Sequence, residues 1–320
     1  MIALTLAQLV TATGGTLVGP RESGLVVIDG PVVTDSRAAG PGGLYVARMG
    51  EHADGHDYVA AAAQAGAVAA LTSRPVPEVP SMPCIVVDDV QTAFGVIARA
   101  ALKQAGADGF GPVVVGVTGS SGKTSTKDLL AQVVAELGPV VAPQGSFNTE
   151  VGLPLTALQV DERTRVLVSE MGARGLGHIA YLCTVTPPRI GVVLNVGSAH
   201  VGEFGSRENI AVTKGELVES VPPAADGGVA VLNADDDLVA AMAPRTRGRV
   251  VRYGRSAEAD VRAEDEAMDD QGRPSFTLVA PGVREHVSLQ LFGAHQVSNA
   301  LAVAAAALEL GVPGDDVPRR

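Results

Sequence analysis

The sequence predicts an α/β protein with a small N-terminal α/β domain, followed by a larger central domain. The central domain is expected to have a mainly parallel sheet with a small antiparallel appendage. Three observations lead to this prediction. Short apolar runs alternate with helix-like segments along most of the chain. From residue 113 onward these runs are near-continuous in Val, Leu and Ile, which is typical of parallel strands covered on both faces. A glycine-rich loop lies between the first of these runs and a helix.

The length of 320 residues indicates about two domains. We assign the first to residues 1–108 and the second to residues 109–313, because the segment Gly106–Pro112 has the composition of a linker. An apolar share of 46% is enough to build both cores. Residues 314–320 continue no regular pattern.

Composition also limits the classes of function. The net charge of −11 argues against a broad nucleic-acid-binding surface, since such surfaces are basic. No uncharged apolar run approaches the roughly 18 residues that indicate a membrane-spanning helix, and the N-terminus lacks the basic start of a secretion signal. Cys84 and Cys183 lie far apart in apolar contexts, which indicates buried thiols. The composition therefore predicts a soluble, cytoplasmic protein.

The first domain is expected to begin with a short amphipathic helix that ends at Gly14-Gly15. Strands are predicted near Leu25–Ile28, Val32–Val33, Leu44–Val46, Ala67–Leu71 and Cys84–Val87. Helices are predicted at Asp57–Ala65 and Gln91–Gln104.

The second domain is expected to contain parallel strands at Val113–Val117, Val140–Ala142, Val166–Ser169, Ile190–Asn195, Val229–Leu232 and Val250–Tyr253. Antiparallel strands are predicted near Val261, Phe276–Val279 and Val287–Leu291. Helices are predicted at Ser125–Leu137 and Val297–Leu310, and the acidic run Asp235–Asp237 is expected to open another helix.

The stretch Gly116–Thr124 reads GVTGSSGKT and joins a strand to a helix. Small residues let backbone N–H groups close around a polyphosphate, and the helix N-terminus adds its positive dipole end. In such loops the lysine, here Lys123, reaches the β- and γ-phosphates, and the hydroxyl of Thr124 binds Mg²⁺. The usual spacing would require a glycine at the position of Val117, whereas the glycines here fall at 116, 119 and 122. The sequence therefore predicts a nucleotide site of an unusual subtype.

Polar side chains follow several of the predicted strands. Glu170 ends one strand, His200 lies in the loop after the next, and Asn148 follows the second strand of this domain. Because ligands gather at the carboxyl ends of parallel strands, we expect Glu170 and His200 to face Lys123 and to share a metal site. Taken by chemistry alone, Lys214 is a solvated helix lysine.

Other candidate side chains allow two interpretations each. His295 and Asn299 lie one turn apart, so they either cap the core or contact the adenine or ribose of a nucleotide. Arg174, just past Glu170, is close enough to meet a substrate carboxylate or phosphate. The loop Thr34–Arg37 either holds a hydroxyl-rich or phosphate-bearing ligand or forms a capped surface turn.

The loop GVTGSSGKTST resembles the nucleotide loop of the Mur ligases, the ATP-dependent amide-forming enzymes of peptidoglycan synthesis. Three further stretches are similar to the family member that joins D-Ala-D-Ala to UDP-N-acetylmuramoyl-tripeptide: FNTEVGLPLTAL (147–158), SEMGARGLGHIAYL (169–182) and NVGSAHVGEFGSRENIAVTKGEL (195–217). In the first domain, VVTDSRAAGPGGLYVA (32–47) and DGHDYVAAAAQAGA (54–67) resemble its UDP-binding domain. The resemblance covers nearly the whole chain.

The resemblance implies that ATP and Mg²⁺ are the cofactors. It implies nucleotide contacts from Gly119, Ser120, Ser121, Gly122, Lys123, Thr124, Ser125, His295 and Asn299. It implies catalytic roles for Lys123, Asn148, Glu170, His200 and Lys214. The implied metal ligands are Thr124, Glu170, His200 and, if it is carbamylated, Lys214. Contacts to the UDP-linked substrate are expected from Thr34, Asp35, Ser36, Arg37 and Arg174.

The implied reaction is ATP-driven amide formation in cell-wall synthesis, and thereby in cell shape and division. The terminal carboxylate of the tripeptide attacks the γ-phosphorus, giving an acyl phosphate and ADP, and the amine of D-Ala-D-Ala then displaces phosphate. The expected partners are these small molecules, without nucleic acid or membrane insertion, and the protein is expected to be a monomer.

The sequence departs from the family pattern in two places. It reads His295-Gln296 where the family has His-Asn, which weakens the nucleotide assignment there. The family also has a third, C-terminal domain, and we interpret residues 314–320 as its start and the chain as a truncated, poorly active form. Two alternatives stay open: a non-catalytic fragment that binds the UDP-substrate or nucleotide, and a sister Mur ligase that adds a single amino acid.

Overall fold

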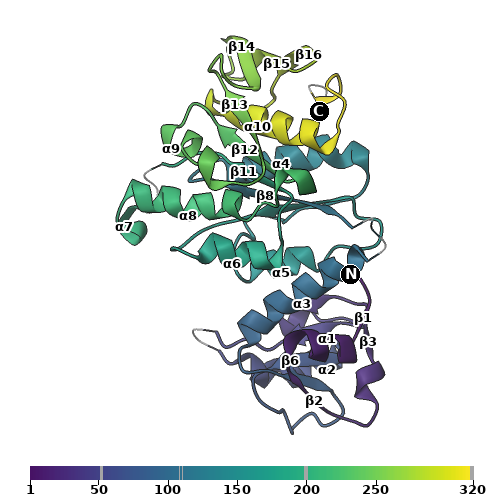
Figure 1. The fold of residues 1–320 in the computed structure, drawn as a ribbon. Helices are drawn as coiled ribbons and strands as arrows, with labels where there is room; N and C mark the ends of the chain where they lie inside the picture. Colours follow the sequence, from purple (N-terminus) through teal and green to yellow (C-terminus); the bar gives the residue numbers. More distant parts are fainter. Residues whose placement is uncertain (51–52, 108, 110, 198–200, 318–320) are drawn as a thin grey trace. The chain divides into compact units, whose positions relative to one another are not determined.

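A computed structural model of the protein describes residues 1–50, 53–107, 109, 111–197 and 201–317. These residues divide into two compact units, whose elements are labelled in Figure 1. The first unit contains Met1–Pro112 and Glu150–Glu162, and the second contains Val113–Thr149 and Arg163–Arg320. Residues 150–162, which the sequence analysis assigned to the second domain, therefore pack with the first.

The first unit is a small α/β unit, as predicted. Its five-stranded sheet has the order β2-β7-β6-β5-β4, in which β4 to β7 are parallel and β2 is antiparallel to β7. The strands are β2 (Thr16–Val18), β4 (Val32–Val33), β5 (Leu44–Val46), β6 (Ala69–Thr72) and β7 (Cys84–Val86). A separate antiparallel pair is formed by β1 (Leu4–Thr5) and β3 (Val27–Ile28).

The helices of the first unit are α1 (Leu6–Thr13), α2 (Val59–Gln64), α3 (Val90–Ala105) and α5 (Gly152–Ala157). The sequence analysis missed α5, because its segment GLPLTA contains the loop residues glycine and proline. Pro154 is tolerated because it lies in the first turn, where a backbone N–H has no intrahelical partner. Leu153 and Ala157 are buried, and α5 contacts α3. This contact explains why the segment belongs to the first unit.

Among the described residues, the second unit forms a nine-stranded sheet with the order β16-β15-β14-β13-β12-β11-β8-β10-β9. Its parallel part comprises β8 (Val113–Thr118), β9 (Val140–Val141), β10 (Val166–Glu170), β11 (Ile190–Val193), β12 (Val229–Asn233) and β13 (Arg249–Gly254). From β8 the chain builds β9 and β10 on one side and then β11 on the other. The carboxyl end of β8 is therefore a topological switch point, where α/β sheets bind ligands.

The last three strands are β14 (Val261–Met268), β15 (Pro274–Ala280) and β16 (Val283–Ser288). They are antiparallel to one another, as predicted, but β14 pairs in parallel with β13, so they continue the same sheet. The final strand begins and ends earlier than the predicted Val287–Leu291. The two-residue turn Pro281-Gly282 sets this register, with Gly282 at a φ of +75°.

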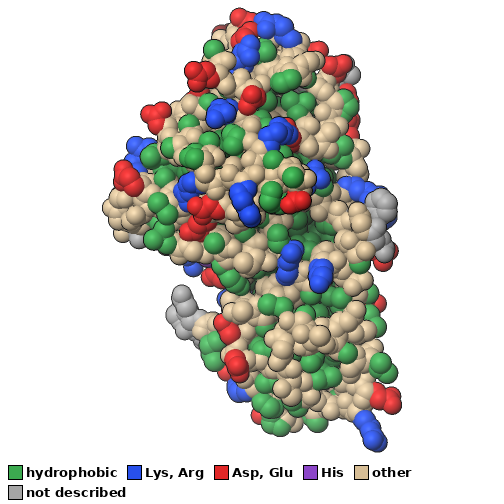
Figure 2. All heavy atoms as spheres, in the orientation of Figure 1, with side chains coloured by type: hydrophobic (Ala, Val, Ile, Leu, Met, Phe, Trp, Pro, Cys, Tyr) green, Lys and Arg blue, Asp and Glu red, His purple; other side chains and the backbone are tan. Residues whose placement is uncertain are grey.

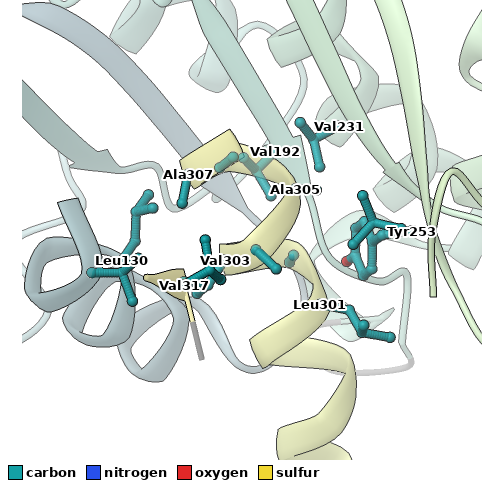
Figure 3. Close-up of a cluster of buried hydrophobic side chains, with 14 of the residues drawn as sticks. Leu130, Val192, Val231, Tyr253, Leu301, Val303, Ala305, Ala307 and Val317 are labelled. Atoms are coloured by element: carbon teal, nitrogen blue, oxygen red, sulfur yellow. The ribbon is translucent and has the colours of Figure 1, made fainter. Parts of the chain in front are cut away.

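The helices of the second unit are α4 (Lys123–Val133), α6 (His178–Val185), α7 (Val201–Phe204), α8 (Arg207–Glu219), α9 (Asp237–Ala240) and α10 (His295–Leu310). Helices α4 and α10 contact each other and share one core cluster with the strands. Figure 3 shows Leu130 of α4, Val303 of α10 and Val317 together in this cluster. The predicted helix opening at the acidic run is present, since Asp236 caps α9.

Helix α8 packs on the opposite face of the sheet. Val115 and Val117 belong to the cluster that includes α10, so Gly116 between them faces the other way. Gly116 pairs directly with Gly191 of β11. A Cβ on Gly116 would lie 2.8 Å from Cδ1 of Leu217 in α8. Because the two glycines lack side chains, they leave a shallow place, a depression in the face of the sheet, that the side chain of Leu217 fills.

Cys84 and Cys183 are buried free thiols, and burial raises the pKa of Cys183 to about 12. Within the described part of the chain, none of the helices has both the length and the apolar character needed to cross a bilayer. On the face drawn in Figure 2, basic and acidic side chains are interspersed.

Candidate functional site

The glycine-rich loop lies between β8 and α4, at the switch point of the sheet. Its conformation is held by the chain segment that follows β11. The N–H of Ser121 donates to Oδ1 of Asn195 (3.0 Å), and Nδ2 of Asn195 donates to the Ser121 carbonyl (3.2 Å). The N–H of Ser120 donates to the Asn195 carbonyl (3.1 Å), and the N–H of Gly197 donates to Oγ of Ser120 (2.9 Å). These bonds fix the loop backbone from one side.

The unusual glycine spacing has a separate physical reason at each position. Gly116 gives space to α8, as described above. A Cβ on Gly119 would lie 2.8 Å from Cβ of Leu194, so only glycine fits between the loop and β11. Gly122 has a φ of +81°, and a Cβ there would lie 2.5 Å from Oδ1 of Asn299. Side chains are therefore excluded at both loop glycines.

Glu170 is the centre of a polar cluster at the end of β10. The residue is only 1% exposed. Its Oε2 accepts a hydrogen bond from Oγ1 of Thr124 (3.1 Å), and its Oε1 accepts one from Nδ2 of Asn148 (2.7 Å). The hydroxyl of Ser146 lies 3.2 Å from that of Thr124. The structure thus brings together the loop threonine, the strand-end glutamate and the asparagine that the sequence analysis selected.

A cavity of about 280 Å³ opens beside this cluster. It is lined by Gly119, Ser120, Lys123, Asn148, Thr149, Gly172, Ala173, Arg174, His178, Phe204, Ile210 and Lys214. Six residues selected from the sequence thus line one cavity: Gly119, Ser120, Lys123, Asn148, Arg174 and Lys214. Arg174 is exposed, and its backbone N–H donates to Nδ1 of His178 (3.1 Å).

Two lysines in this cavity are partly or fully withdrawn from water. Nζ of Lys123 donates to the Gly119 carbonyl (2.8 Å). Burial lowers the pKa of Lys123, and the carboxylate of Glu170 partly opposes that change. Lys214 is 6% exposed, so the solvated position expected from its chemistry is wrong. Burial, and then the charge of Lys123, lower the pKa of Lys214 to about 7.

The residues around Glu170 fit a magnesium ion. Oxygen ligands of octahedral Mg²⁺ lie about 2.1 Å from the ion, so neighbouring ligands are about 3 Å apart. Oγ1 of Thr124 and Oε2 of Glu170 are separated by 3.1 Å, which matches this spacing. His200, another predicted ligand, lies outside the described residues.

The start of α10 lies against the glycine-rich loop. Asn299 is buried beside Gly122 and donates from Nδ2 to Oε1 of Gln296 (2.9 Å). Gln296, the departure from the family pattern, is buried as well, whereas His295 is exposed. Asn299 thus lies at the loop, and the residue that replaces the family's asparagine orients it.

Thr34–Arg37 lies in the first unit. Asp35 caps a short 3-10 turn, Ser36–Ala38, by accepting from the N–H of Arg37 (3.0 Å). Its carboxylate also pairs with the guanidinium of Arg37 (2.6 Å), and these bonds hold the pKa of Asp35 well below its usual value. The capped surface turn is therefore present. Arg37 has 88% of its side chain exposed, so it is available to an anionic ligand as well.

Three residues that the sequence analysis did not select contribute to this site. Asn195 holds the glycine-rich loop, Ser146 contacts Thr124, and Lys127 is buried in α4 with its ammonium on the 142–149 loop. Asn195 had a signal in the sequence, since it follows a parallel strand at the same edge as Glu170. Lys127 had none, because a lysine in a helix is usually solvated.

A parallel sheet whose switch-point strand leads into a glycine-rich loop with Lys-Thr at a helix start defines a P-loop nucleotide-binding fold. Comparison with known families narrows the class. The Mur ligase middle domain matches residues 117–307, and the Mur ligase family catalytic domain matches residues 31–102. The chain belongs to the Mur ligase family.

Similar proteins agree with this assignment. The UDP-N-acetylmuramoyl-tripeptide–D-alanyl-D-alanine ligase of Mycobacterium bovis is 47% identical over 99% of this chain and 65% of the relative. MurF from Acinetobacter baumannii has a crystal structure with a TM-score of 0.88 and 31% identity, covering 99% of this chain and 67% of that one. MurF ligase from Thermotoga maritima, in complex with ADP, has a TM-score of 0.77 and 32% identity, covering 91% and 66%. The chain thus spans about 65% of the length of the first of these relatives.

Proposed function

We propose that the chain carries the UDP-substrate-binding and ATP-binding parts of a ligase that joins D-Ala-D-Ala to UDP-N-acetylmuramoyl-tripeptide. The observation that carries this proposal is the cavity at the carboxyl end of β8, which is lined by the glycine-rich loop, two lysines and Asn148, the hydrogen-bond partner of Glu170. The names of the similar ligases and the ADP in the Thermotoga maritima complex support the choice of substrates and of ATP. In this proposal the first unit binds the UDP-linked substrate and the second binds ATP.

The cavity supplies what acyl-phosphate chemistry requires. A carboxylate is a poor acyl donor because its leaving group is oxide, and phosphorylation replaces that group with phosphate. The transfer needs the terminal carboxylate and the γ-phosphate held in line, with their negative charges neutralised. Lys123 can provide such charge from the loop, and Arg174 can hold a substrate carboxylate at the cavity wall. The acyl phosphate is then open to the amine of D-Ala-D-Ala.

Thr124, Glu170 and His200 are the proposed ligands of Mg²⁺, which supplies further charge neutralisation when it is bound. We assign Lys214 to the same group in carbamylated form. Its neutral amine would add CO₂ and release a proton, which gives a carbamate with two oxygen ligands. The burial of Lys214 in the cavity and its pKa of about 7 support this assignment, because only the uncharged amine reacts with CO₂. Carbon-13 NMR of the protein in the presence of ¹³CO₂ tests this assignment. We expect a resonance from a lysine carbamate, and it should be lost in Lys214→Ala.

The remaining assignments concern the binding of ATP and of the UDP end of the peptide substrate. Ser120, Ser121 and Ser125 contribute to phosphate binding, and His295 and Asn299 contribute to binding of the nucleoside. Thr34–Arg37 binds the UDP end of the peptide substrate. In this proposal the protein acts as a cytoplasmic monomer in peptidoglycan synthesis.

Phosphate release from ATP tests the proposed function. The chain is given UDP-N-acetylmuramoyl-tripeptide and Mg²⁺, with and without D-Ala-D-Ala, and binding of the UDP-substrate and of ADP is measured in parallel. Phosphate release that requires both UDP-N-acetylmuramoyl-tripeptide and D-Ala-D-Ala supports the ligase. Binding of both ligands without release supports the alternative of a non-catalytic substrate- and nucleotide-binding module. Failure to bind either ligand would contradict both.

The choice of amine substrate distinguishes the proposed ligase from the remaining alternative, a sister Mur ligase. A sister Mur ligase would release phosphate with a single amino acid in place of D-Ala-D-Ala. Assays with D-Ala-D-Ala, D-glutamate, lysine and diaminopimelate as the amine distinguish these enzymes. Tripeptides that end in lysine or in diaminopimelate, offered with D-Ala-D-Ala, identify the third residue of the peptide substrate.

A further inference from the structure

Lys127 of α4 is a lysine whose whole side chain lies inside the protein. The residue is 1% exposed. Its Nζ donates to the Pro143 carbonyl (2.6 Å) and to the Gly145 carbonyl (3.3 Å), and it pairs with Oδ1 of Asp128 (2.6 Å). Burying an ammonium is costly unless its hydrogens are bonded, and here each of the three hydrogens has an acceptor. Lys127 therefore forms a specific link between α4 and the 142–149 loop.

This loop carries two of the side chains that define the polar cluster at Glu170. Ser146 follows directly after Gly145, whose carbonyl Lys127 holds, and Asn148 follows two residues later. Ser146 contacts the hydroxyl of Thr124 (3.2 Å), and Asn148 donates to Oε1 of Glu170 (2.7 Å). Lys127 lies one turn beyond Thr124 on the same helix, so α4 holds the loop at two successive turns.

The contacts that Thr124 and Lys127 make with the loop differ in strength. The hydroxyl contact from Thr124 is weak and partly exposed, whereas the Lys127 ammonium is charged, buried and bonded to two backbone carbonyls. Charged donors form stronger hydrogen bonds than neutral ones. Asn148 is also held directly, since its carbonyl accepts from the N–H of Gly172 (2.8 Å). Lys127 fixes the part of the loop that precedes Ser146 and Asn148, and it thereby contributes to the position of Asn148 beside the Glu170 carboxylate.

We propose that Lys127 is a positioning residue for the metal-binding pair Thr124 and Glu170, acting through the 142–149 loop. The inference rests on the proposed function, since it assumes that Thr124 and Glu170 bind Mg²⁺ together with a nucleotide. Lys127 itself touches neither the metal nor the phosphates. Its removal should weaken the contribution of Mg²⁺ to nucleotide binding while leaving the glycine-rich loop and Lys123 in place.

Calorimetric titration of the 320-residue chain with ADP, with and without Mg²⁺, tests this inference. Lys127→Met removes all three bonds at similar side-chain length. We expect it to reduce the gain in ADP affinity that Mg²⁺ provides by about 10- to 100-fold, as for other residues that orient metal ligands. ADP affinity without Mg²⁺ should stay close to that of the parent chain, because the loop residues Gly119–Lys123 are unchanged.

Leu130→Ala is the matched control, because Leu130 is equally buried one turn further along α4 but lies in the apolar core. It should lower stability and leave the gain from Mg²⁺ unchanged. Hydrogen exchange gives a second readout. In Lys127→Met, and in Lys127→Gln if the methionine variant does not fold, the amides of residues 144–149 should exchange faster, while those of residues 119–122 keep their rates.

A double-mutant cycle with Asn148→Ala separates positioning from general destabilisation. If Lys127 acts through Asn148, the two changes together should reduce the gain from Mg²⁺ no more than the larger single change does. Additive losses, or an unchanged gain in Lys127→Met, would overturn the inference while leaving the proposed function intact. Absence of any gain from Mg²⁺ in the parent chain would contradict the proposed function first, and the inference with it.

Discussion

Lys214 shows what burial does to a single charged residue in this protein. Its pKa falls to about 7 in the folded state, first because of burial and then because of the charge on Lys123. In the unfolded chain a lysine titrates near its ordinary value of about 10.4. Between these two values the Lys214 site binds more protons in the unfolded state than in the folded state, so its contribution to stability rises with pH.

We therefore predict that Lys214→Met is more stable than the parent chain at pH 7, and that the difference shrinks as the pH rises toward 9. The slope of the difference should not exceed about 1.4 kcal/mol per pH unit. Urea unfolding of both chains between pH 6.5 and 9, in buffers freed of CO₂, measures it. A difference that is constant over this range would show that Lys214 is ionised normally in the folded protein.

Lys123 is the residue on which phosphate binding depends in the proposed function. Lys123→Ala removes the ammonium that the loop presents beside Gly119. We expect loss of measurable ADP binding and of any ATP-dependent activity, with stability nearly unchanged because the side chain makes a single bond to the loop carbonyl. Lys103→Ala, at an exposed position of α3 in the first unit, is the control and should bind ADP normally. Retained binding by Lys123→Ala would contradict the assignment of the phosphate loop.

At the scale of elements, α8 is positioned by the shallow place that Gly116 and Gly191 leave in the sheet. Leu217 fills this place and is fully buried. The same helix carries Lys214, one turn earlier, into the cavity. The approach of α8 to the sheet therefore determines how deeply Lys214 reaches toward the glycine-rich loop.

A pair of substitutions tests this packing. Gly116→Ala should destabilise the protein by about 1–3 kcal/mol, because the added methyl overlaps Leu217. Leu217→Ala should cost about 2–5 kcal/mol through the cavity that it leaves. Since the new methyl fills part of that cavity, the double variant should cost less than the two single changes added together.

Chemical denaturation of the four chains measures these values. Gly175→Ala is the control, because a Cβ at Gly175 meets no atom within 4 Å, and its effect should stay within about 0.5 kcal/mol. Strictly additive losses for Gly116→Ala and Leu217→Ala would show that the two residues do not share this space.

The elements also show how far sequence reasoning reaches. The bounds of the parallel strands were predicted to within two residues at each end, because apolar runs bounded by turn residues mark them in the sequence. Helix α5 was missed because Gly152 and Pro154 are typical of loops, and the fact that Pro154 lies in a first turn depends on tertiary packing. The predicted position of the last strand was wrong because the Pro281-Gly282 turn, rather than the apolar pattern, sets its register.

The residues of the candidate site also divide into those that could be predicted from the sequence and those that could not. Lys123 and Thr124 were predictable because the loop, strand and helix are contiguous in the sequence. Glu170 and Asn148 followed from the rule that strand ends share an edge. The burial of Lys127 and Lys214 was not predictable from residue type, because it depends on the 142–149 loop and on the depth at which α8 packs.

At the scale of the whole molecule, the chain completes its first unit only after it has begun the second. Helix α5, in residues 150–162, packs on α3 and separates two stretches of the second unit. We predict that residues 1–112 alone unfold in a broad, weakly cooperative transition. Joining residues 1–112 to 150–162 through a flexible Gly/Ser linker should restore a cooperative transition.

Thermal unfolding followed by circular dichroism compares the two fragments. The control carries the same linker and segment with Leu153→Asp, which places a charge where α5 is buried and should abolish the gain. A cooperative transition for residues 1–112 alone would show that the first unit does not depend on α5.

The return of the chain to its first unit has a consequence for biosynthesis. Fifty residues lie between Pro112 and the end of the returning segment at Glu162. At a synthesis rate of about 5–20 residues per second, the ribosome needs roughly 3–10 s to supply them. During that interval the surface of α3 that α5 will cover is exposed in the nascent chain. The N-terminal unit of this protein therefore cannot finish folding before the first stretch of the second unit, Val113–Thr149, has been translated. Chaperones that recognise apolar helix faces have time to bind it.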